Sequence, residues 1–412
     1  MARILFFNRS FYFDDTNGAS VASRALLEVL ARRGFAVRVV CGTCVDQGVG
    51  DAGALLGARV AGPVAAALGR SPNVCMGAER LVRVLSGRSH GVEVSTLDGP
   101  LRRHEAPTGE EVHDLLTLLD AEFTQRRPDV LVTYGGDPLT LAALRGARIA
   151  GIKTVFVLHN FRYEARSVFQ DVDRVVVPSE YSSSHYRRKL GLECTVLPNL
   201  VDPARIAADL RSPDYVTFVN PSPEKGVYAF ARIADELGKQ RPEIKLLVVE
   251  SRGDESTLAR CGLDLRARGN VFLMANTPDP RRFWAVTRLC LMPSLFRESQ
   301  GLVAVEAMVN GIPVIGSDRG ALPETLGRAG IVLPLPDHLT PSSRHLPRGE
   351  EVGPWVEAII RLWDDPGAYA ESSRRTLAEA ERWSPSVLGP RWVDFFRTLI
   401  DHSSDPTGEL LR

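Results

Sequence analysis

The stretch of sequence that decides the fold is residues 296–324, which read FRESQGLVAVEAMVNGIPVIGSDRGALPE. Glu298 precedes a helix predicted over Gly301–Asn310, and Glu306 lies inside that helix, eight positions later. The first amides of a helix have no intrahelical partners, and the helix dipole makes this end positive, so a diphosphate fits there. One carboxylate before this turn and another behind it offer acceptors for sugar hydroxyls. The stretch therefore predicts a site for a nucleotide sugar.

On both sides of this stretch, short β-branched runs alternate with amphipathic helical segments, which predicts parallel sheets built from βα units. In the first half we expect strands over Arg3–Asn8, Phe35–Cys41, Asp129–Tyr134, Lys153–His159, Asp173–Ser179 and Cys194–Asn199. The pattern restarts at Tyr215–Asn220, and a helix is expected over Gly226–Gln240. The segment Gly42–Ser71 has weak periodicity and is expected to be irregular.

We therefore predict an α/β protein with two doubly wound, Rossmann-like domains and a helical tail. The N-terminal domain is expected over residues 1–202 and the second over 203–375, while the helices of 376–412 pack back on the first domain. Ligands of such sheets bind outside the carboxyl ends of the strands. The two domains are therefore expected to face each other across a binding cleft.

Composition restricts the classes of function. The 412 residues carry 50 Lys+Arg and 50 Asp+Glu, and the resulting formal net charge of zero gives no attraction to nucleic acid. No apolar run reaches the roughly 20 residues that span a bilayer, and the N-terminal stretch does not read as a signal peptide. Six cysteines make no disulfide framework, so a cytoplasmic protein is expected. Cys41 and Cys44 are expected to pack in the core rather than to bind a metal.

A second stretch, residues 219–237, reads VNPSPEKGVYAFARIADEL. Lysine is rare in this chain, yet Lys225 follows a predicted strand and turn, where its ammonium group can neutralise a leaving diphosphate. The alternative interpretation is a solvated PEKG turn with no catalytic role. The two glutamates described above favour the catalytic interpretation.

These motifs resemble the E-x7-E motif of the retaining glycosyltransferases of glycosyltransferase family 4, which have the two-domain GT-B fold. The matching positions are Glu298, Gly301, Leu302, Val303, Glu306, Ala307, Gly311, Pro313, Val314, Ser317, Asp318, Gly320, Pro323 and Glu324. The resemblance implies that Glu298 lies beside the donor sugar and that Glu306 holds the ribose hydroxyls. The amides of Gly301–Val303 would hold the sugar and the diphosphate, and Lys225 would be catalytic.

Weaker matches fall at strand ends in the first half. His159 ends a predicted strand where the family often has a histidine that reaches the donor sugar, so it is a further catalytic candidate. Gly18 precedes the first helix at the place of a family Gly-Gly loop. Gly135, Gly136 and Asp137 follow another strand, and with Gly18 they are the acceptor-side candidates. Simple turns and a satisfied strand-end histidine are the alternatives.

Two departures from the family pattern bear on the chemistry. Asn220, a donor-binding candidate, stands where the family usually has an arginine, five positions before Lys225, so a second positive charge is missing. Gln300 replaces a common aromatic residue beside the sugar. The identity of the donor sugar therefore does not carry over from the family, although a UDP- or GDP-linked donor is the expectation.

The resemblance implies retaining transfer, without a metal or another cofactor, to a hydroxyl of a glycan, glycolipid or small molecule. A nucleotide-sugar epimerase on the same fold and a catalytically degenerate nucleotide-sugar-binding protein are the alternatives. A glycosidase would need Glu298 and Glu306 to face each other across the scissile bond, which one helix-borne glutamate disfavours. No nucleic-acid partner and no transmembrane segment are expected. Arg187–Lys189 indicate a solvated helix face rather than contact with a membrane surface or an anionic acceptor.

Overall fold

The computed structural model describes residues 1–46, 50–60, 65–73, 78–103, 106–265 and 268–401. The chain divides into two compact units. Unit 1 comprises Met1–Pro178, Ser183–Leu200 and Leu388–Arg412, and unit 2 comprises Ser179–Ser182 and Val201–Val387. The predicted tail begins at residue 376, whereas the structure assigns 376–387 to unit 2 and places the return to unit 1 at Leu388. The end of that tail, 402–412, lies outside the described residues.

Unit 1 is built on a 10-stranded sheet with the order β10-β9-β8-β7-β1-β2-β5-β4-β3, and β6 pairs with β2. The strands are β1 (Arg3–Ser10), β2 (Ala36–Val45), β3 (Ala65–Asn73), β4 (Ala78–Ser89), β5 (Val92–Leu97), β6 (Arg102–Arg103), β7 (Val130–Thr133), β8 (Lys153–Val157), β9 (Arg174–Val177) and β10 (Cys194–Val196). Every pairing from β10 to β5 is parallel. The carboxyl ends of these strands therefore lie along one edge, and the parallel pattern predicted from the sequence is confirmed.

The far side of this sheet departs from the prediction. The described part of Gly42–Ser71 is not irregular, because β2 continues to Val45, the helix α2 covers Ala52–Arg59, and β3 begins at Ala65. Residues 47–49 and 61–64 of this segment lie outside the described residues. The side chain of Asp51 caps α2, which gives this short helix a defined start. β3, β4 and β5 then pair antiparallel, so unit 1 is a mixed sheet rather than a purely parallel one.

Helices cover both faces of the unit 1 sheet. They are α1 (Gly18–Arg32), α2, α3 (Gly109–Ala121), the π-helical turn η1 (Glu122–Arg126), α4 (Pro138–Ile149), the 3₁₀ turn η2 (Arg166–Phe169), α5 (Glu180–Leu190) and α14 (Pro385–Asp401). α3 and α4 bury apolar side chains against β1, β2 and β7. This burial stabilises the unit by roughly 25 cal/mol for each Å² of apolar surface removed from water. α3 continues directly into η1, so residues 109–126 form one helical segment.

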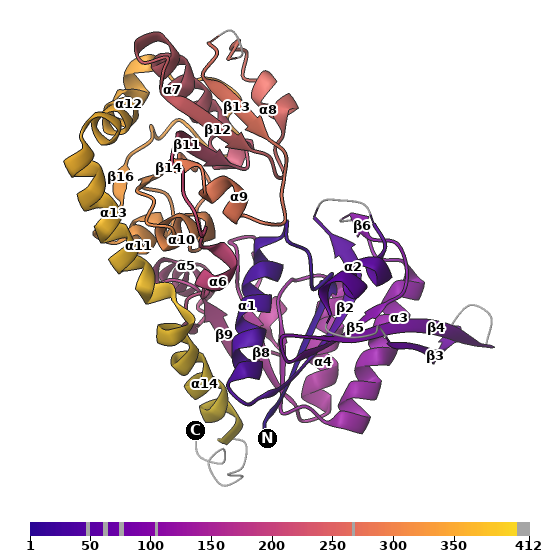
Figure 1. Cartoon of the computed structure of the whole chain (residues 1–412). Helices are drawn as coiled ribbons and strands as arrows, with labels where there is room; N and C mark the ends of the chain where they lie inside the picture. The colour runs from indigo at the N-terminus through magenta and orange to yellow at the C-terminus, as the bar shows by residue number, and fades with distance from the viewer. Residues whose placement is uncertain (47–49, 61–64, 74–77, 104–105, 266–267, 402–412) are drawn as a thin grey trace. The chain divides into compact units, whose positions relative to one another are not determined.

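The last helix completes unit 1, as predicted. α14 lies beside α1 (Figure 1), and the rings of Phe35 and Phe396 pack edge to face with centroids 6.3 Å apart. Trp392 is 1% exposed, and its indole N–H donates to the carbonyl oxygen of Pro198 at 3.1 Å. The C-terminal helix is therefore part of the unit 1 core.

Unit 2 is built on a 6-stranded, fully parallel sheet with the order β13-β12-β11-β14-β15-β16. The strands are β11 (Tyr215–Val219), β12 (Lys245–Val249), β13 (Val271–Met274), β14 (Thr287–Met292), β15 (Val314–Ser317) and β16 (Ile331–Leu333). The helices and 3₁₀ turns are α6 (Pro203–Ile206), η3 (Pro223–Lys225), α7 (Val227–Gln240), α8 (Glu255–Ala259), α9 (Arg281–Trp284), α10 (Leu302–Val309), α11 (Leu322–Leu326), α12 (Gly349–Asp364), α13 (Pro366–Ala380) and η4 (Glu381–Trp383). α7 and α12 share one core with the sheet, and α10 packs against α13. Both units therefore have the predicted Rossmann-like α/β architecture.

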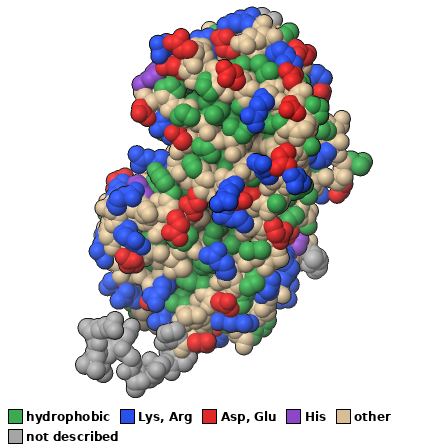
Figure 2. Space-filling view, turned by 90° about the vertical axis from the view of Figure 1, so that its left-hand side faces the viewer, with side chains coloured by type: hydrophobic (Ala, Val, Ile, Leu, Met, Phe, Trp, Pro, Cys, Tyr) green, Lys and Arg blue, Asp and Glu red, His purple; other side chains and the backbone are tan. Residues whose placement is uncertain are grey.

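The surface mixes charges of both signs. Figure 2 shows basic and acidic side chains lying beside one another over most of one face, as the equal counts of 50 and 50 lead one to expect. Within the described ranges, none of the helices has the length and apolar character needed to cross a bilayer.

Candidate active site

The first turn of α10 forms the centre of the candidate site in unit 2. Gly301 caps this helix with a φ of 89°, and an ideal Cβ there would lie 2.7 Å from Cδ2 of Leu322, so the position favours glycine. No described side chain caps the helix, which leaves the first-turn amides of Leu302 and Val303 without a capping partner. This end of the helix can therefore bind an anion.

Glu298 lies just before this turn. It is 6% exposed and sits in an extended segment that bridges to Gly320. Its Oε1 accepts a hydrogen bond from Oγ of Ser294 at 2.8 Å and another from Nζ of Lys225 at 2.5 Å. The structure thus brings together two predicted catalytic residues, and their charge-assisted hydrogen bond places the ammonium group beside α10.

The turn that carries Lys225 is fixed by backbone contacts. The N–H of Phe296 donates to the carbonyl oxygen of Glu224 at 2.8 Å, which ties the turn after β11 to the loop after β14. Gly226 has a φ of 85°, and an ideal Cβ there would lie 1.8 Å from the carbonyl oxygen of Pro293. A glycine is therefore needed for this close approach. The backbone of the PEKG turn is therefore tied to the loop after β14, while the side chain of Glu224 stays exposed.

Glu306 lies on α10 in a more enclosed position. Its residue keeps some accessible surface, yet burial of the carboxyl raises its pKa to about 7, and the neighbouring indole N–H of Trp284 acts in the opposite direction. Near neutral pH both the acid and the carboxylate are therefore populated. Asn310 holds the following turn, because its Nδ2 donates to the backbone carbonyl oxygen of Glu306 at 2.9 Å. The carboxyl can exchange hydrogen bonds with ligand hydroxyls.

Asn220 has a structural role that its sequence position did not reveal. It directly follows β11 with a φ of 65°, a left-handed conformation that asparagine tolerates better than arginine does. Its Oδ1 accepts a hydrogen bond from the N–H of Gly253 at 3.0 Å, which ties the loops after β11 and β12 together. Its assignment to donor binding stays a prediction.

In unit 1, His159 follows β8 at the carboxyl edge of the sheet. Burial lowers the pKa of its imidazole to about 4, so the ring is neutral at physiological pH. Its ring packs edge to face on Tyr134, with centroids 5.3 Å apart, and the Tyr134 hydroxyl lies 2.9 Å from Oγ of Ser20. His159 and the donor-side residues belong to different units.

The four acceptor-side candidates occupy turns at the same edge of unit 1. Gly18 begins α1, and a Cβ there would meet no atom within 4 Å. Gly135 has a φ of 98°, and a Cβ on Gly136 would lie 3.0 Å from the Tyr163 ring. The carboxylate of Asp137 caps α4 by accepting from two of its first amides. Backbone conformation, packing and helix capping therefore explain Gly135, Gly136 and Asp137. Contacts of all four candidates with an acceptor stay predictions.

Two further residues of the candidate site were not predicted from the sequence. Ser294 follows β14 and binds Glu298, and Tyr134 follows β7 and packs on His159. Tyr134 stands directly after β7 and Ser294 two positions after the end of β14, at the edge where parallel sheets bind ligands. His159 matches a histidine that the family often has, whereas Ser294 and Tyr134 match no family motif, and their position after a strand is the signal in the sequence that points to them.

Among the residues that the structure describes, no group of three or more His, Cys, Asp or Glu side chains is arranged to hold a metal ion. Cys41 is buried in β2, where burial raises the pKa of its thiol to about 11. This thiol is therefore protonated at neutral pH and is a poor ligand or nucleophile.

Family profiles match both units. One described as "Glycosyltransferase Family 4" matches residues 16–205, and one described as "Glycosyl transferases group 1" matches residues 213–346, which include Lys225, Glu298 and Glu306. The chain belongs to glycosyltransferase family 4.

Curated relatives support this membership. This family 4 chain is 26% identical over 314 residues to a GDP-mannose-dependent monoacylated α-(1-6)-phosphatidylinositol monomannoside mannosyltransferase of Corynebacterium glutamicum, covering 68% of this chain and 79% of the relative. It is 29% identical over 281 residues to the phosphatidyl-myo-inositol mannosyltransferase of Mycolicibacterium smegmatis, covering 63% and 68%.

Solved structures show the same GT-B fold. Anabaena HepE in complex with UDP-glucose matches with a TM-score of 0.64 and 17% identity, over 97% of this chain and 100% of that one. The catalytic domain of starch synthase IV from Arabidopsis thaliana matches with a TM-score of 0.69 and 12% identity, over 97% and 99%. At these identities the likeness concerns the fold alone.

Proposed function

We propose that this glycosyltransferase moves a sugar from a nucleotide-diphosphate sugar to a hydroxyl group with retention of the anomeric configuration and without a bound metal. The observation that carries the proposal is the Lys225–Glu298 ion pair, 2.5 Å long, next to the uncapped first turn of α10. A cation beside open backbone amides is the arrangement that stabilises a departing diphosphate.

The donor side is assigned to unit 2. The diphosphate would lie against the amides of Leu302 and Val303, with Lys225 turned from Glu298 toward the leaving oxygen. The carboxylate of Glu298 would then accept hydrogen bonds from hydroxyl groups of the sugar and so orient the sugar's C1 atom. Glu306 would bind the ribose hydroxyls from further along α10, where its raised pKa allows it to accept or donate.

The proposed reaction needs no carboxylate nucleophile. The bond between C1 and the diphosphate oxygen breaks, and the acceptor oxygen forms its bond to C1 on the same face. The proton of the acceptor hydroxyl passes to the released diphosphate oxygen, so charge and atoms balance. Lys225 and the helix terminus stabilise the charge that develops on the diphosphate, while Glu298 positions the sugar.

The acceptor side is assigned to unit 1. The neutral imidazole of His159 is proposed to contact the sugar as a hydrogen-bonding group without adding charge. Gly18, Gly135, Gly136 and Asp137 stand at the same edge as candidate acceptor contacts. The acceptor classes considered are a glycan, a glycolipid and a small molecule.

For the donor, UDP- and GDP-linked sugars are the first choices. The name of the Corynebacterium relative specifies GDP-mannose, and the HepE structure holds UDP-glucose. These are properties of those proteins, and they define which nucleotides to test here.

One observation favours a second candidate function. The side chain of Asn220 is a neutral amide, so this position adds no positive charge beside Lys225, and its Oδ1 is engaged by the Gly253 amide at 3.0 Å. A catalytically degenerate protein that binds nucleotide sugars without transferring them, or an epimerase acting without an acceptor, would fit such a site.

Calorimetric titration with UDP, GDP, ADP and dTDP tests the proposal first. We expect one nucleotide to bind with roughly micromolar affinity and to lose at least about tenfold in Glu306→Ala. The matched control is Glu357→Ala, which removes an exposed carboxylate from α12 of the same unit and should leave binding unchanged. Absence of binding to all four nucleotides contradicts the proposal.

A second assay separates transfer from binding. The sugar donor of the preferred nucleotide is incubated with candidate acceptors, and release of nucleoside diphosphate is followed together with the anomeric proton signal of the product. An α-linked donor should give an α-linked product. Binding without release of the nucleoside diphosphate supports the degenerate protein, and conversion of the donor sugar without an acceptor supports the epimerase.

A further inference from the structure

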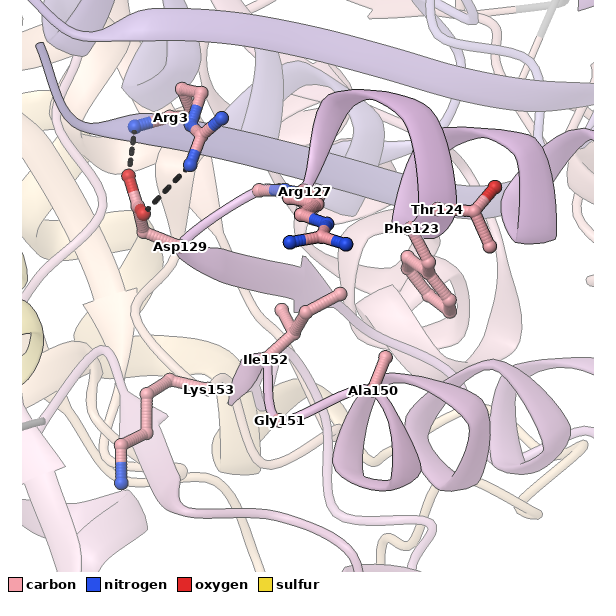
Figure 3. Close-up of a pocket in the computed structure, with 10 residues that line it drawn as sticks. Arg3, Phe123, Thr124, Arg127, Asp129, Ala150, Gly151, Ile152 and Lys153 are labelled. Atoms are coloured by element: carbon pink, nitrogen blue, oxygen red, sulfur yellow. Dashed lines mark hydrogen bonds and ion pairs between the residues drawn. The ribbon is translucent and has the colours of Figure 1, made fainter.

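A cavity of about 460 Å³ opens in unit 1, and no candidate residue of the transferase site lines it. Its size falls within the roughly 300–1,000 Å³ of small-molecule sites. The cavity lies at the amino edge of the sheet, where Arg3 begins β1, Asp129 precedes β7 and Lys153 begins β8. Phe123 and Ile152 supply apolar surface (Figure 3).

The charges around this cavity are unbalanced. Asp129 is occupied by Arg3, whose backbone N–H donates to one carboxylate oxygen at 2.7 Å and whose guanidinium lies 3.4 Å from the other. The side chains of Arg127 and Lys153 have no hydrogen-bond or ion-pair partner within the described ranges. Three cations against one carboxylate leave the lining with a charge of +2.

The backbone beside the cavity is also unusual. Phe123 belongs to the π-helical turn η1, a rare conformation that is found frequently at functional sites. The turn ends at Arg127, which has a left-handed backbone with a φ of 46°. Arg127 is the C-cap of this turn, a place where a left-handed residue is common but is usually glycine, so an arginine here is unusual. In Figure 3 its guanidinium lies above Ile152, between Arg3 and Phe123.

We propose that this cavity binds a small phosphate monoester of about the size of a sugar phosphate. The phosphoryl group would lie at the guanidinium groups of Arg127 and Arg3, because planar guanidinium matches phosphate oxygens in paired hydrogen bonds. A phosphate monoester carries close to two negative charges at pH 7, which complements the lining. The body of the ligand would rest on Phe123 and Ile152, with Lys153 at the rim.

The site is separate from the proposed transferase site and does not depend on it. Asp129 directly precedes β7 and Tyr134 directly follows it, while β8 runs from Lys153 toward His159. The cavity therefore lies at one end of β7 and β8, and Tyr134 and His159 lie at the other end. A phosphate ester bound there would not compete with an acceptor at the carboxyl edge.

Calorimetric titration of the full chain with glucose 6-phosphate, inorganic phosphate and glucose tests the proposal. Glucose 6-phosphate should bind, inorganic phosphate should bind more weakly, and glucose should not bind. Arg127→Gln should weaken glucose 6-phosphate binding at least tenfold. The matched control is Arg126→Gln, the adjacent exposed arginine, which does not line the cavity and should bind as the wild type does.

A second variant separates charge from folding. Arg127→Gly keeps the left-handed backbone available, so it should melt at or above the wild-type temperature while losing at least tenfold in affinity. Absence of saturable binding to both phosphate probes overturns the proposal. So does equal weakening in Arg126→Gln and Arg127→Gln, or wild-type affinity in Arg127→Gly.

Discussion

The carboxyl edges of the two sheets carry different chemistry on the same architecture. In unit 2 the edge is charged and cross-connected, because Lys225 binds Glu298 and the loops after β11 and β14 share backbone hydrogen bonds. In unit 1 the carboxylate of Asp137 is engaged in capping α4, and the edge also carries the neutral ring of His159, the Tyr134 hydroxyl and the Ser20 hydroxyl. A Rossmann-like sheet supplies the edge, and the residues after each strand decide which ligand it can hold.

The difference indicates a division of labour. Charged groups and open amides suit a diphosphate, which must leave with its negative charge stabilised. Neutral groups suit a sugar or another polyhydroxy compound, which needs hydrogen bonds without strong charge. Substitutions made in one unit and measured through the other unit test this division.

The largest expected effect concerns the helix that completes unit 1. Trp392→Ala removes a side chain that is 1% exposed, and the cavity should lower the free energy of unfolding by about 3–5 kcal/mol. Urea denaturation measures this change. Arg397→Ala, an exposed position on the same helix, should change the free energy of unfolding by less than about 0.5 kcal/mol. Nucleotide affinity at low temperature should stay at the wild-type value, and a parallel loss of affinity would contradict separate roles for the two units.

The next effect concerns catalysis in unit 2. Lys225→Ala removes the cation beside Glu298 and should lower the rate of sugar transfer by about 100- to 1,000-fold. Steady-state release of nucleoside diphosphate measures it. Lys245→Ala, which removes a lysine on β12 of the same unit, should transfer at close to the wild-type rate. A rate in Lys225→Ala equal to this control would remove Lys225 from the proposed mechanism.

A pair of glycine substitutions compares the two edges directly. Gly301→Ala forces a residue with a φ of 89° into contact with Leu322 and should destabilise the protein by about 1–3 kcal/mol. Gly18→Ala meets open space at the start of α1 and should be neutral or stabilising by up to about 1 kcal/mol. Both values come from denaturant unfolding. Equal changes in stability for the two variants would show that Gly301 is no more sterically constrained than Gly18.

The two edges should also respond oppositely to pH. The pKa of Glu306 rises from 4.5 to about 7 on folding, so its contribution to stability is greatest below pH 4.5 and is lost as pH rises toward 7. The pKa of His159 falls from 6.5 to about 4, so its contribution is present above pH 6.5 and is lost as pH falls toward 4.

Melting temperatures between pH 4.5 and 6.5 test these opposite slopes. Relative to the wild type, Glu306→Gln should make the melting temperature rise more steeply with pH, because the opposing contribution is gone. His159→Phe should make it rise less steeply or fall. Parallel profiles for both variants would mean that neither group is buried in the way the structure indicates.

The smallest expected effect is that of metal removal. If Lys225 and the first turn of α10 supply the stabilising charge, dialysis against EDTA should leave the transfer rate within experimental error. A loss of rate on dialysis that Mg²⁺ or Mn²⁺ restores would contradict the proposed mechanism. It would show that Lys225 and the first turn of α10 do not stabilise the leaving diphosphate without a metal.

Much of unit 2 could be predicted from the sequence because its signals are local. The run from Glu298 to Glu324 encodes a strand end, a glycine turn and a helix in consecutive residues, and the pairing of Glu298 with Lys225 follows once both loops are placed at one edge. The role of Asn220 could not be predicted in this way. Its left-handed φ and its bond to Gly253 depend on a neighbouring loop that is distant in sequence.

Unit 1 was harder to predict because part of its sheet is antiparallel. β4 and β5 form a hairpin whose turn is His90–Gly91, with φ values of 49° and 85°. A histidine is an uncommon first residue for this turn type, in which Asn-Gly and Asp-Gly are the usual signals. Gly42–Ser71 has no strong periodicity, so α2 and the start of β3 depend on contacts with the rest of the sheet.

The division of α14 between the two units has a consequence for laboratory recombination. The chain passes between the units after Pro178, Ser182, Leu200 and Val387, so unit 1 is encoded in three separate stretches. A chimera that takes its second half from another family member by one crossover near Leu200 would receive a foreign last helix. The side chains of that foreign helix would then take the places of Trp392 and Phe396 against Pro198 and Phe35 of this chain, and the packing would not match. Donor halves should therefore be exchanged with two junctions, the second at Val387, so that each parent keeps the helix that belongs to its own core.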